Sequence, residues 1–198
     1  MISILDYGAG NLRSVQNTLD EIGAQYKLVH AGDELRAATK IVLPGVGHFG
    51  QMMRALDEMQ VRDAIIDRIH AGVPFLGICL GLQALFESSE EAPELRGFGI
   101  FGGTVRRFDG SARVPHMGWD DLAVVRRSKL LANVGSAPYM YFAHSYYAPV
   151  VAATAATCTY TVPYTAVLER DHVFGVQFHP EKSGPLGLQI VRNFVELC

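Results

Sequence analysis

Short apolar runs alternate with amphipathic, helix-like stretches through the first half of the chain. Four of the runs have the length and the β-branched content of buried strands: residues 2–5, 26–30, 41–43 and 74–78. Helical spacing of apolar residues lies between and after them, at residues 11–22, 52–56, 61–70 and 81–87. Because strands that alternate with helices form parallel sheets covered on both faces, the pattern predicts an α/β fold with a doubly wound sheet.

The pattern changes after about residue 97, where short strand-like runs follow one another without helices. These runs predict an antiparallel extension of the sheet, at residues 103–108, 139–146, 157–161, 166–170 and 173–178. A final helix is expected over residues 186–197. Functional sites in such sheets lie beyond the C-terminal ends of the parallel strands, so reactive side chains are expected there.

Composition excludes several classes of protein. A length of 198 residues suits one domain, and a net charge of −3 without any Lys/Arg block argues against nucleic-acid and membrane-surface partners. No apolar run approaches the roughly 20 residues of a membrane span. The three cysteines, at positions 79, 158 and 198, have neither metal-site nor disulfide spacing, so we expect a cytoplasmic, reducing environment.

The segment from Gly77 to Gly81 joins an expected buried strand to an expected helix, with Cys79 at its centre. Glycines on both sides permit a sharp turn that exposes the cysteine, as in a nucleophile elbow. The N-terminus of the following helix favours the thiolate form. Taken without its neighbours, Cys79 is equally compatible with a small buried packing residue. The elbow context favours a nucleophile.

A second strand end carries His179, Pro180 and Glu181. Residues two apart in an extended segment point to the same side, so Glu181 is placed to orient the imidazole and to stabilise its charged form. Pro180 favours extended geometry because it fixes its own φ and biases the preceding residue away from helix. A surface turn explains the tripeptide equally well on its own. Together with the elbow it predicts a catalytic triad of Cys79, His179 and Glu181.

A third strand end is the loop Pro44-Gly45-Val46-Gly47. Glycine-rich loops can direct free backbone N–H groups at a developing oxyanion. We therefore expect an oxyanion hole formed by the N–H groups of Val46 and of Leu80, the residue after the nucleophile. Such a sequence is more often only a tight turn, and its position beside the other two strand ends favours the catalytic interpretation.

The three motifs together resemble those of the triad-type, or class I, glutamine amidotransferases, whose fold is a flavodoxin-like α/β sheet. Further segments are typical of the glutaminase subunits of imidazole glycerol phosphate synthase: residues 6–15 (DYGAGNLRSV), 44–50 (PGVGHFG), 115–119 (PHMGW) and 179–183 (HPEKS). Other members of the family usually have a glycine where this chain has Val46. The resemblance covers essentially the whole chain and implies a single amidotransferase domain over residues 1–198.

The resemblance implies that the chain hydrolyses L-glutamine to glutamate and ammonia without a cofactor or a metal. It also implies a heterodimer with a (β/α)8-barrel cyclase subunit. That subunit uses the ammonia to make imidazole glycerol phosphate and an aminoimidazole carboxamide ribotide in L-histidine biosynthesis. The residues suit this chemistry, since a thiolate can attack the side-chain amide and His179 can protonate the departing ammonia.

Substrate and partner contacts follow from the same resemblance. Glutamine is expected to contact Gly47, Gln83 and the backbone around Ser145 and Tyr146. Glu91 is a candidate for the substrate ammonium, although residues 87–94 are nearly as compatible with an acidic, solvated run. The positions expected to face the cyclase are Asn11, His116, Met117, Trp119, Tyr141 and Lys182. Trp119 is the only tryptophan, and a large amphipathic ring suits an interface, but ordinary core packing is the alternative for part of this set.

Val46 suggests a form of regulation. A β-branched residue resists the positive-φ conformations that glycine adopts. We hypothesise that the Val46 peptide sits with its N–H turned away from the substrate until the partner binds its own ligand. The glutaminase would then be silent when the ammonia has no acceptor.

Three other interpretations share part of this evidence. A glutaminase of anthranilate or GMP synthesis has the same triad but should lack the segments at residues 6–11 and 115–119. A stand-alone cysteine hydrolase of the same fold would turn over without a partner. A non-enzymatic member of the fold would tolerate Cys79→Ala. Fold alone does not separate these classes, whereas the motifs favour the subunit.

Overall fold

The computed structural model describes residues 1–8 and 11–198, and within them a sheet of eight strands runs through the molecule in the order β2-β1-β3-β4-β13-β12-β11-β8. The first five strands in that order are parallel: Tyr26–Val29, Ile2–Leu5, Ile41–Gly45, Phe75–Cys79 and Val173–Val176. The other three are antiparallel: Pro163–Arg170, Thr154–Thr159 and Ala123–Val124. This order and these directions confirm the flavodoxin-like sheet with an antiparallel extension. The run at residues 173–178 was expected in that extension, which is wrong, because β13 pairs with β4 and lies parallel to it.

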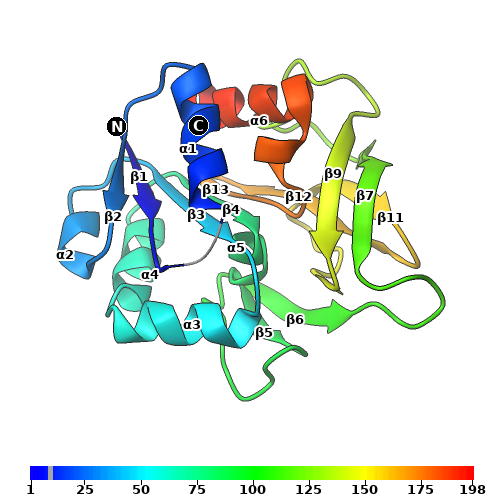
Figure 1. Cartoon of the computed structure of the whole chain (residues 1–198), viewed down its shortest axis with the longest axis horizontal. Helices are drawn as coiled ribbons and strands as arrows, with labels where there is room; N and C mark the ends of the chain where they lie inside the picture. Colours follow the sequence, from blue (N-terminus) through cyan, green and yellow to red (C-terminus); the bar gives the residue numbers. More distant parts are fainter. Residues whose placement is uncertain (9–10) are drawn as a thin grey trace.

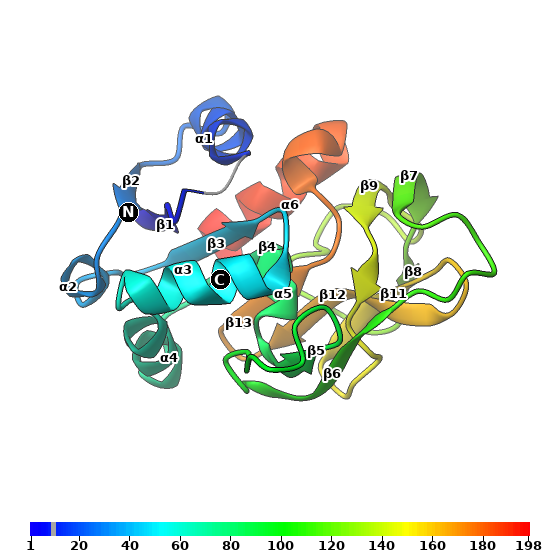
Figure 2. The same ribbon diagram turned by 60° about the horizontal axis from the view of Figure 1, so that its bottom comes forward.

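Helices cover both faces of the sheet (Figures 1 and 2). On one face lie α1 (Leu12–Glu21) and α6 (Gly184–Leu197), and on the other lie α3 (Phe49–Glu58) and α4 (Arg62–His70), with the short α2 (Gly32–Leu35) packed against α4. Each parallel strand feeds both apolar cores. In β3, for example, Ile41 and Leu43 pack with α3 and α4, whereas Val42 packs with α1 and α6. Burial on both faces explains why these strands are continuous apolar runs in the sequence.

The helix after Cys79 is shorter than the sequence predicts. It was expected over residues 81–87, but α5 spans only Leu80–Gln83, and Phe86–Ser89 form strand β5. The Phe98 N–H donates to the carbonyl of Ala84 at 2.7 Å, and the side chain of Phe86 is fully buried. Pairing with a segment more than ten residues downstream therefore overrides the local helical pattern.

Two of the expected antiparallel strands do not extend the main sheet. The run at residues 103–108 belongs to β6 (Phe101–Arg107), which lies between β5 and β10 (Tyr146–Tyr147) in a three-stranded sheet. The run at residues 139–146 divides into β10 and β9 (Tyr139–His144), and β9 pairs with β7 (His116–Asp121). Strand β7 was not predicted from the sequence. The prediction of one continuous extension is wrong for these runs because strand pairing depends on contacts between residues far apart in the chain.

The C-terminal ends of β3, β4 and β13 meet at one edge of the main sheet. Gly45 is the register partner of Cys79, and Val176 is the partner of Ile78. The residues that follow these strands are thereby brought together, including a short 3₁₀-helix, η1 (Pro180–Lys182), after β13. This edge is where the sheet type predicts a functional site.

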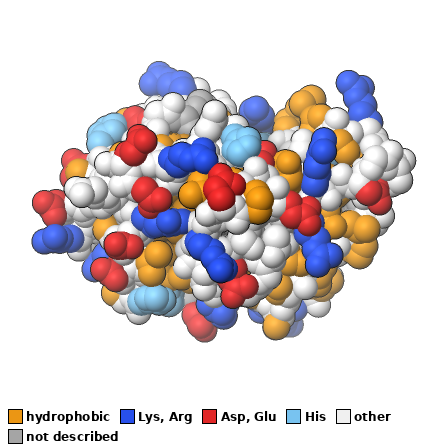
Figure 3. All heavy atoms as spheres, turned by 90° about the horizontal axis from the view of Figure 1, so that it is seen from below, with side chains coloured by type: hydrophobic (Ala, Val, Ile, Leu, Met, Phe, Trp, Pro, Cys, Tyr) orange, Lys and Arg blue, Asp and Glu red, His pale blue; other side chains and the backbone are white. Residues whose placement is uncertain are grey.

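The surface carries charges of both signs. Acidic and basic side chains are interspersed over the face that contains α3 (Figure 3), in keeping with a net charge of −3. Among the helices of the described residues, none is both long enough and apolar enough to cross a bilayer.

Candidate active site

Cys79 lies in a strained turn at the end of β4. Its φ of 53° and ψ of −104° fall outside the regions that residues with a Cβ normally occupy. A Cβ on Gly77 would lie 2.3 Å from the Gly81 carbonyl oxygen, and one on Gly81 would lie 2.1 Å from the carbonyl oxygen of Leu43. Only glycine fits at either position, so the two glycines allow the turn that the sequence analysis expected of a nucleophile elbow.

His179 and Glu181 form a buried pair beyond the end of β13. The distance from His179 Nδ1 to Glu181 Oε1 is 2.8 Å, and the two side chains are 3% and 2% exposed. Burial acts to lower the pKa of His179, but the hydrogen bonds with Cys79 and with Glu181 outweigh it and raise the pKa to about 10. The imidazole therefore interacts with the thiol on Cys79 and with the carboxylate together.

The backbone that joins this pair differs from the expected extended segment. Pro180 begins η1, and the N–H of Lys182 donates to the carbonyl of His179 at 3.0 Å. Ser183 Oγ donates to the same carbonyl at 2.7 Å. The two bonds close a tight turn, and this turn brings Glu181 toward the imidazole. The contact was predicted, but the backbone that makes it is a turn and not an extended segment.

Asn11 also contacts the Glu181 carboxylate. Its Nδ2 donates a hydrogen bond to Oε1, the oxygen that pairs with His179. Asn11 precedes α1 in a left-handed conformation with φ of 75°, which asparagine tolerates better than most residues. Asn11 was expected to face a partner, and its contact with Glu181 was not predicted. The asparagine holds the carboxylate in place for the histidine.

A cavity of about 250 Å³ opens beside Cys79. The two residues predicted to form the oxyanion hole, Val46 and Leu80, line it, and so do all five predicted substrate contacts: Gly47, Gln83, Glu91, Ser145 and Tyr146. His179 lines it as well. The structure therefore brings the reactive groups and the predicted substrate contacts into one concave site, the usual form of a small-molecule site.

Two side chains of this cavity have their positions fixed by hydrogen bonds. Glu91 Oε2 accepts from the backbone N–H of Phe49, the first residue of α3, at 2.7 Å, so Glu91 is anchored rather than freely solvated. Gln83 Nε2 donates to the carbonyl of Tyr146 at 2.8 Å and to Gln177 Oε1 at 3.1 Å. Fixed side chains lose less conformational entropy when a ligand binds.

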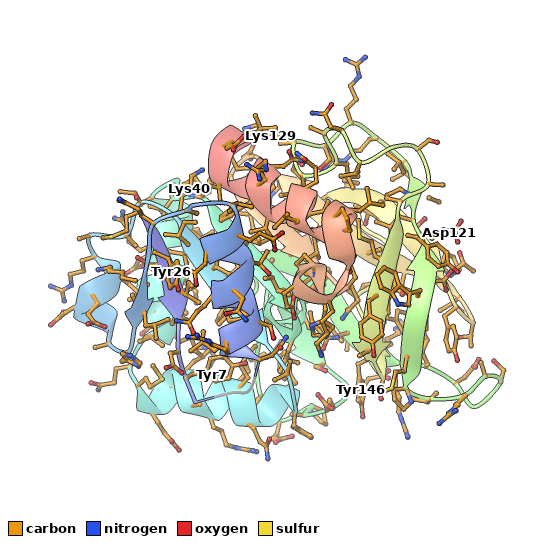
Figure 4. All side chains as sticks on the ribbon, turned by 45° about the horizontal axis from the view of Figure 1, so that its top comes forward. Tyr7, Tyr26, Lys40, Asp121, Lys129 and Tyr146 are labelled. Carbon is orange, nitrogen blue, oxygen red and sulfur yellow. The ribbon has the colours of Figure 1, made fainter. Side chains whose placement is uncertain are left out.

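Tyr7 and Val46 lie together beside a second cavity, next to the one that contains Cys79. Burial raises the pKa of Tyr7, and the Val46 N–H opposes that rise, although the hydroxyl makes no hydrogen bond of normal length within the described residues. Tyr7 and Tyr146 lie toward the same edge of the molecule (Figure 4). Val46 lines both the cavity beside Cys79 and the cavity beside Tyr7, whereas Tyr7 lines only the second.

An exposed aromatic surface on β7 and β9, here called the β7–β9 surface, adjoins the cavity. Met117 and Trp119 are 65% and 48% exposed, and Trp119 stacks on Tyr139 with ring centroids 6.4 Å apart. Tyr141 is the register partner of Trp119, and Lys182 Nζ lies 5.9 Å from the Tyr141 ring. Four of the six residues expected to face a partner therefore gather here. Tyr139 was missed, although its position two residues before Tyr141 on one strand indicates the same face.

His116 differs from the rest of the set that was expected to face a partner. It is 4% exposed, and its ring stacks on Tyr160 and on Phe142 at centroid distances of 4.1 and 5.0 Å. Strand alternation explains the difference, because His116 and Met117 point to opposite faces of β7. The His116 side chain packs beneath the β7–β9 surface and takes no direct part in it.

His144 is a buried, neutral residue of the cavity wall. Its Nδ1 lies 2.9 Å from the carbonyl of Tyr146, which can only accept, so Nδ1 carries the proton and donates. Nε2 then accepts from the Tyr164 hydroxyl at 3.3 Å. Burial lowers the pKa of His144 to about 3, although the bond to the carbonyl opposes the shift. No signal around His144 in the sequence singled it out.

We expect acid to destabilise the fold through His144. The unfolded chain binds a proton at this histidine below about pH 6.5, whereas the folded chain does so only near pH 3, so stability falls as the pH decreases through this window. At about pH 4.5 the loss from this group is about 2 to 3 kcal/mol. Urea unfolding at neutral and at acidic pH measures it.

The comparison needs two variants. His144→Asn keeps an N–H donor for the Tyr146 carbonyl and removes the titrating ring, so it should lose less stability on acidification than the parent protein. His70→Asn removes an exposed histidine and should lose as much as the parent. An identical loss in His144→Asn and in the parent would contradict the assignment.

The chain is similar to known proteins over nearly its whole length. The family model described as "Glutamine amidotransferase class-I" matches residues 3–198. A solved structure described as that of a glutamine amidotransferase superposes with a TM-score of 0.78 at 20% identity, covering 99% of this chain and 97% of that one. That likeness concerns the fold. The family match covers nearly the whole sequence, and the chain belongs to the class-I glutamine amidotransferase family.

Similarity to curated proteins places the chain within one group of this family. The imidazole glycerol phosphate synthase subunit HisH of Desulfitobacterium hafniense is 45% identical over 196 residues, which cover 98% of this chain and 93% of that protein. The chloroplastic imidazole glycerol phosphate synthase hisHF of Arabidopsis thaliana is 42% identical over 201 residues, covering 98% of this chain and 34% of that protein. Within the family, the chain therefore groups with the HisH subunits of imidazole glycerol phosphate synthase.

Proposed function

We propose that the chain hydrolyses L-glutamine through a triad of Cys79, His179 and Glu181 and passes the ammonia to a cyclase partner. One observation carries the proposal: Cys79 and His179 line the same cavity at the strand ends, and the His179 imidazole lies 2.8 Å from the buried Glu181 carboxylate. A histidine between a thiol and a buried carboxylate can take the thiol proton and return it to a leaving group.

The reaction proceeds in two steps. The thiolate of Cys79 attacks the side-chain carbonyl carbon of glutamine, and the oxygen becomes an oxyanion that accepts from the N–H groups of Val46 and Leu80. The C–N bond then breaks, and ammonia leaves with a proton from His179. Water, deprotonated by His179, attacks the γ-glutamyl thioester, which releases glutamate and restores the thiol.

Substrate recognition uses the anchored groups of the cavity. Glu91 faces the cavity with one carboxylate oxygen bonded to α3, so its negative charge is fixed for the substrate ammonium. Gln83 uses its NH2 group within the protein and retains its carbonyl oxygen as an acceptor for the substrate. Gly47, Ser145 and Tyr146 complete the wall with backbone groups.

The partner docks on the β7–β9 surface. This surface is an exposed, largely apolar patch of the kind that proteins bury in interfaces. It consists of Met117, Trp119 and Tyr139, with Lys182 beside Tyr141. Relatives named as a synthase subunit and as a longer hisHF protein support a cyclase as the partner. With that partner the products are imidazole glycerol phosphate and an aminoimidazole carboxamide ribotide, in L-histidine biosynthesis.

Glutamate production from glutamine tests the proposal. The purified chain is assayed alone, with a (β/α)8-barrel cyclase subunit, and with that subunit and its nucleotide substrate. Little activity alone and a large rise with both additions are expected. Full activity without a partner would retain the triad and refute the subunit role, leaving a stand-alone hydrolase.

The Val46 peptide is proposed to limit the basal activity. Val46 borders both the cavity beside Cys79 and the cavity beside Tyr7, so its N–H can point to either side, and the oxyanion hole is complete only when the partner and its ligand turn that N–H toward Cys79. Because one oxyanion donor contributes about 10²- to 10³-fold to the rate, Val46→Gly should raise the basal rate of glutamate production by about 10- to 100-fold. Val46→Ala, which keeps a Cβ and its resistance to positive φ, is the matched control and should rise less. An unchanged basal rate in Val46→Gly would refute this proposal.

A further inference from the structure

Gln177 contacts the sulfur of the proposed nucleophile. It follows β13 two residues before His179, and its side-chain Nε2 lies 3.5 Å from Cys79 Sγ. The residue is fully buried, and its backbone N–H donates to the carbonyl of Ala166 at 2.9 Å. A buried amide at this distance is a hydrogen-bond donor to sulfur, and its backbone position on the sheet is fixed.

Gln83 determines which end of the Gln177 amide faces the sulfur. Gln83 Nε2 donates to Gln177 Oε1 at 3.1 Å, and the same nitrogen donates to the carbonyl of Tyr146 at 2.8 Å. That carbonyl can only accept, so the nitrogen of Gln83 must lie on this side. Gln177 must then present its oxygen to Gln83 and its NH2 group to Cys79. The opposite orientation would place two NH2 groups against each other and an amide oxygen against the sulfur.

We propose that Gln177 is a catalytic residue that donates a hydrogen bond to the Cys79 sulfur and stabilises its thiolate, with Gln83 as the residue that positions it. The proposal rests on the function proposed above and adds a group outside the triad. A donor aimed at an anion forms a stronger hydrogen bond than one aimed at a neutral acceptor, and burial strengthens it further. The same N–H also holds the sulfur toward the cavity before substrate binds.

Several titratable groups of the described residues lie around Cys79, and each must be kept while Gln177 is changed. His179 acts on Cys79 directly, Glu181 lies 2.8 Å behind that histidine, and Glu91 lines the same cavity. Tyr7 and Tyr164 also couple to Cys79, but burial raises the pKa of both phenols, so both are uncharged at neutral pH. A change in thiolate population caused by a Gln177 variant therefore reports the lost hydrogen bond, provided that His179 is retained.

Alkylation of Cys79 by iodoacetamide as a function of pH measures the thiolate directly. The background carries Cys158→Ala and Cys198→Ser, so that Cys79 is the one remaining thiol. Gln177→Met keeps an unbranched side chain of similar length and removes the donor. The pH midpoint of alkylation should rise by about one to two units, and the rate at neutral pH should fall by about tenfold or more.

Two further variants and a control sharpen the result. Gln177→Glu keeps the shape and replaces the donor by a carboxylate, so its midpoint should rise more, and it carries the test if the methionine variant does not fold. Gln83→Met frees the Gln177 amide to turn, so its midpoint should rise less. Gln189→Met removes an amide on α6 that bonds to Asn193 and should leave the midpoint unchanged.

An unchanged midpoint in a folded Gln177 variant would overturn the proposal and leave Gln177 as a structural bridge between Gln83 and β13. Alkylation needs neither glutamine nor a partner. Its outcome is therefore separate from the glutamate assay, in which failure of the parent protein would refute the proposed function.

Discussion

Replacing Cys79 by alanine should reduce glutamate production by at least about 10⁴-fold, with the cyclase partner and its ligand present. Alanine has no group that can form the thioester, and the remaining cavity and N–H groups can only bind the substrate. The fold should be retained, because alanine is no larger than cysteine at a site that is 6% exposed. Steady-state assays of both proteins at equal concentration measure the difference.

Cys158→Ala is the matched control. Cys158 is a second buried thiol, 1% exposed on β11, and it does not line the cavity. Its removal should leave glutamate production near the parent value and reduce the free energy of unfolding by about 1 kcal/mol. Comparable activity in Cys79→Ala and in Cys158→Ala would exclude a cysteine nucleophile and favour a non-enzymatic role.

The parallel half of the sheet was predictable because its information is local. Residues 2–5 are a strand in the sequence analysis and in the structure, and β3 and β4 differ from their predicted bounds by one or two residues at an end. Strands buried on both faces are continuous apolar runs, and the helices between them have clear amphipathic spacing. The order of these strands then follows from the usual topology of doubly wound sheets.

The half of the chain after residue 97 was less predictable because its strands pair with strands that are far away in the sequence. Parallel pairing of β5 with β6 places Phe86 and Glu87, the last two residues of a predicted helix, in a strand. Pairing of β7 with β9 creates the surface that carries Trp119, and Gly118 within β7 weakens the local strand signal. Neither pairing is encoded in the composition of a single strand.

Site residues that belong to a recognisable motif were predicted from the sequence. Residues that only support the motif residues through hydrogen bonds were not. Cys79 lies between two glycines and His179 precedes a proline, and these residue types mark turns in a sequence. His144 has no such neighbour, and Gly175 before Gln177 lies inside β13 and marks no turn, so the roles of both residues come from hydrogen bonds to the Tyr146 carbonyl and to Cys79. One signal was available for Gln177, since it lies two residues before His179 on the same side of an extended chain.

Gly81→Ala should damage the site through the backbone, although it adds only one methyl group. The new Cβ would lie 2.1 Å from the Leu43 carbonyl oxygen, so α5 or β3 must move. Such overpacking costs about 3 kcal/mol, whereas the better helix propensity of alanine returns only about 1 kcal/mol. The clash therefore dominates, and the free energy of unfolding in urea should fall by about 2 kcal/mol.

The same movement should reduce glutamate production by about 100-fold, because a shift of about 1 Å at a catalytic group has effects of that size. Gly110→Ala is the matched control, since a Cβ there meets no atom within 4 Å in the described part of the chain. It should keep full activity and stability within about 1 kcal/mol of the parent. If Gly81→Ala matched that control, the elbow would not depend on a close approach of β3 and α5. Positioning of Cys79 would then depend on its own hydrogen bonds, with the Gln177 amide foremost among them.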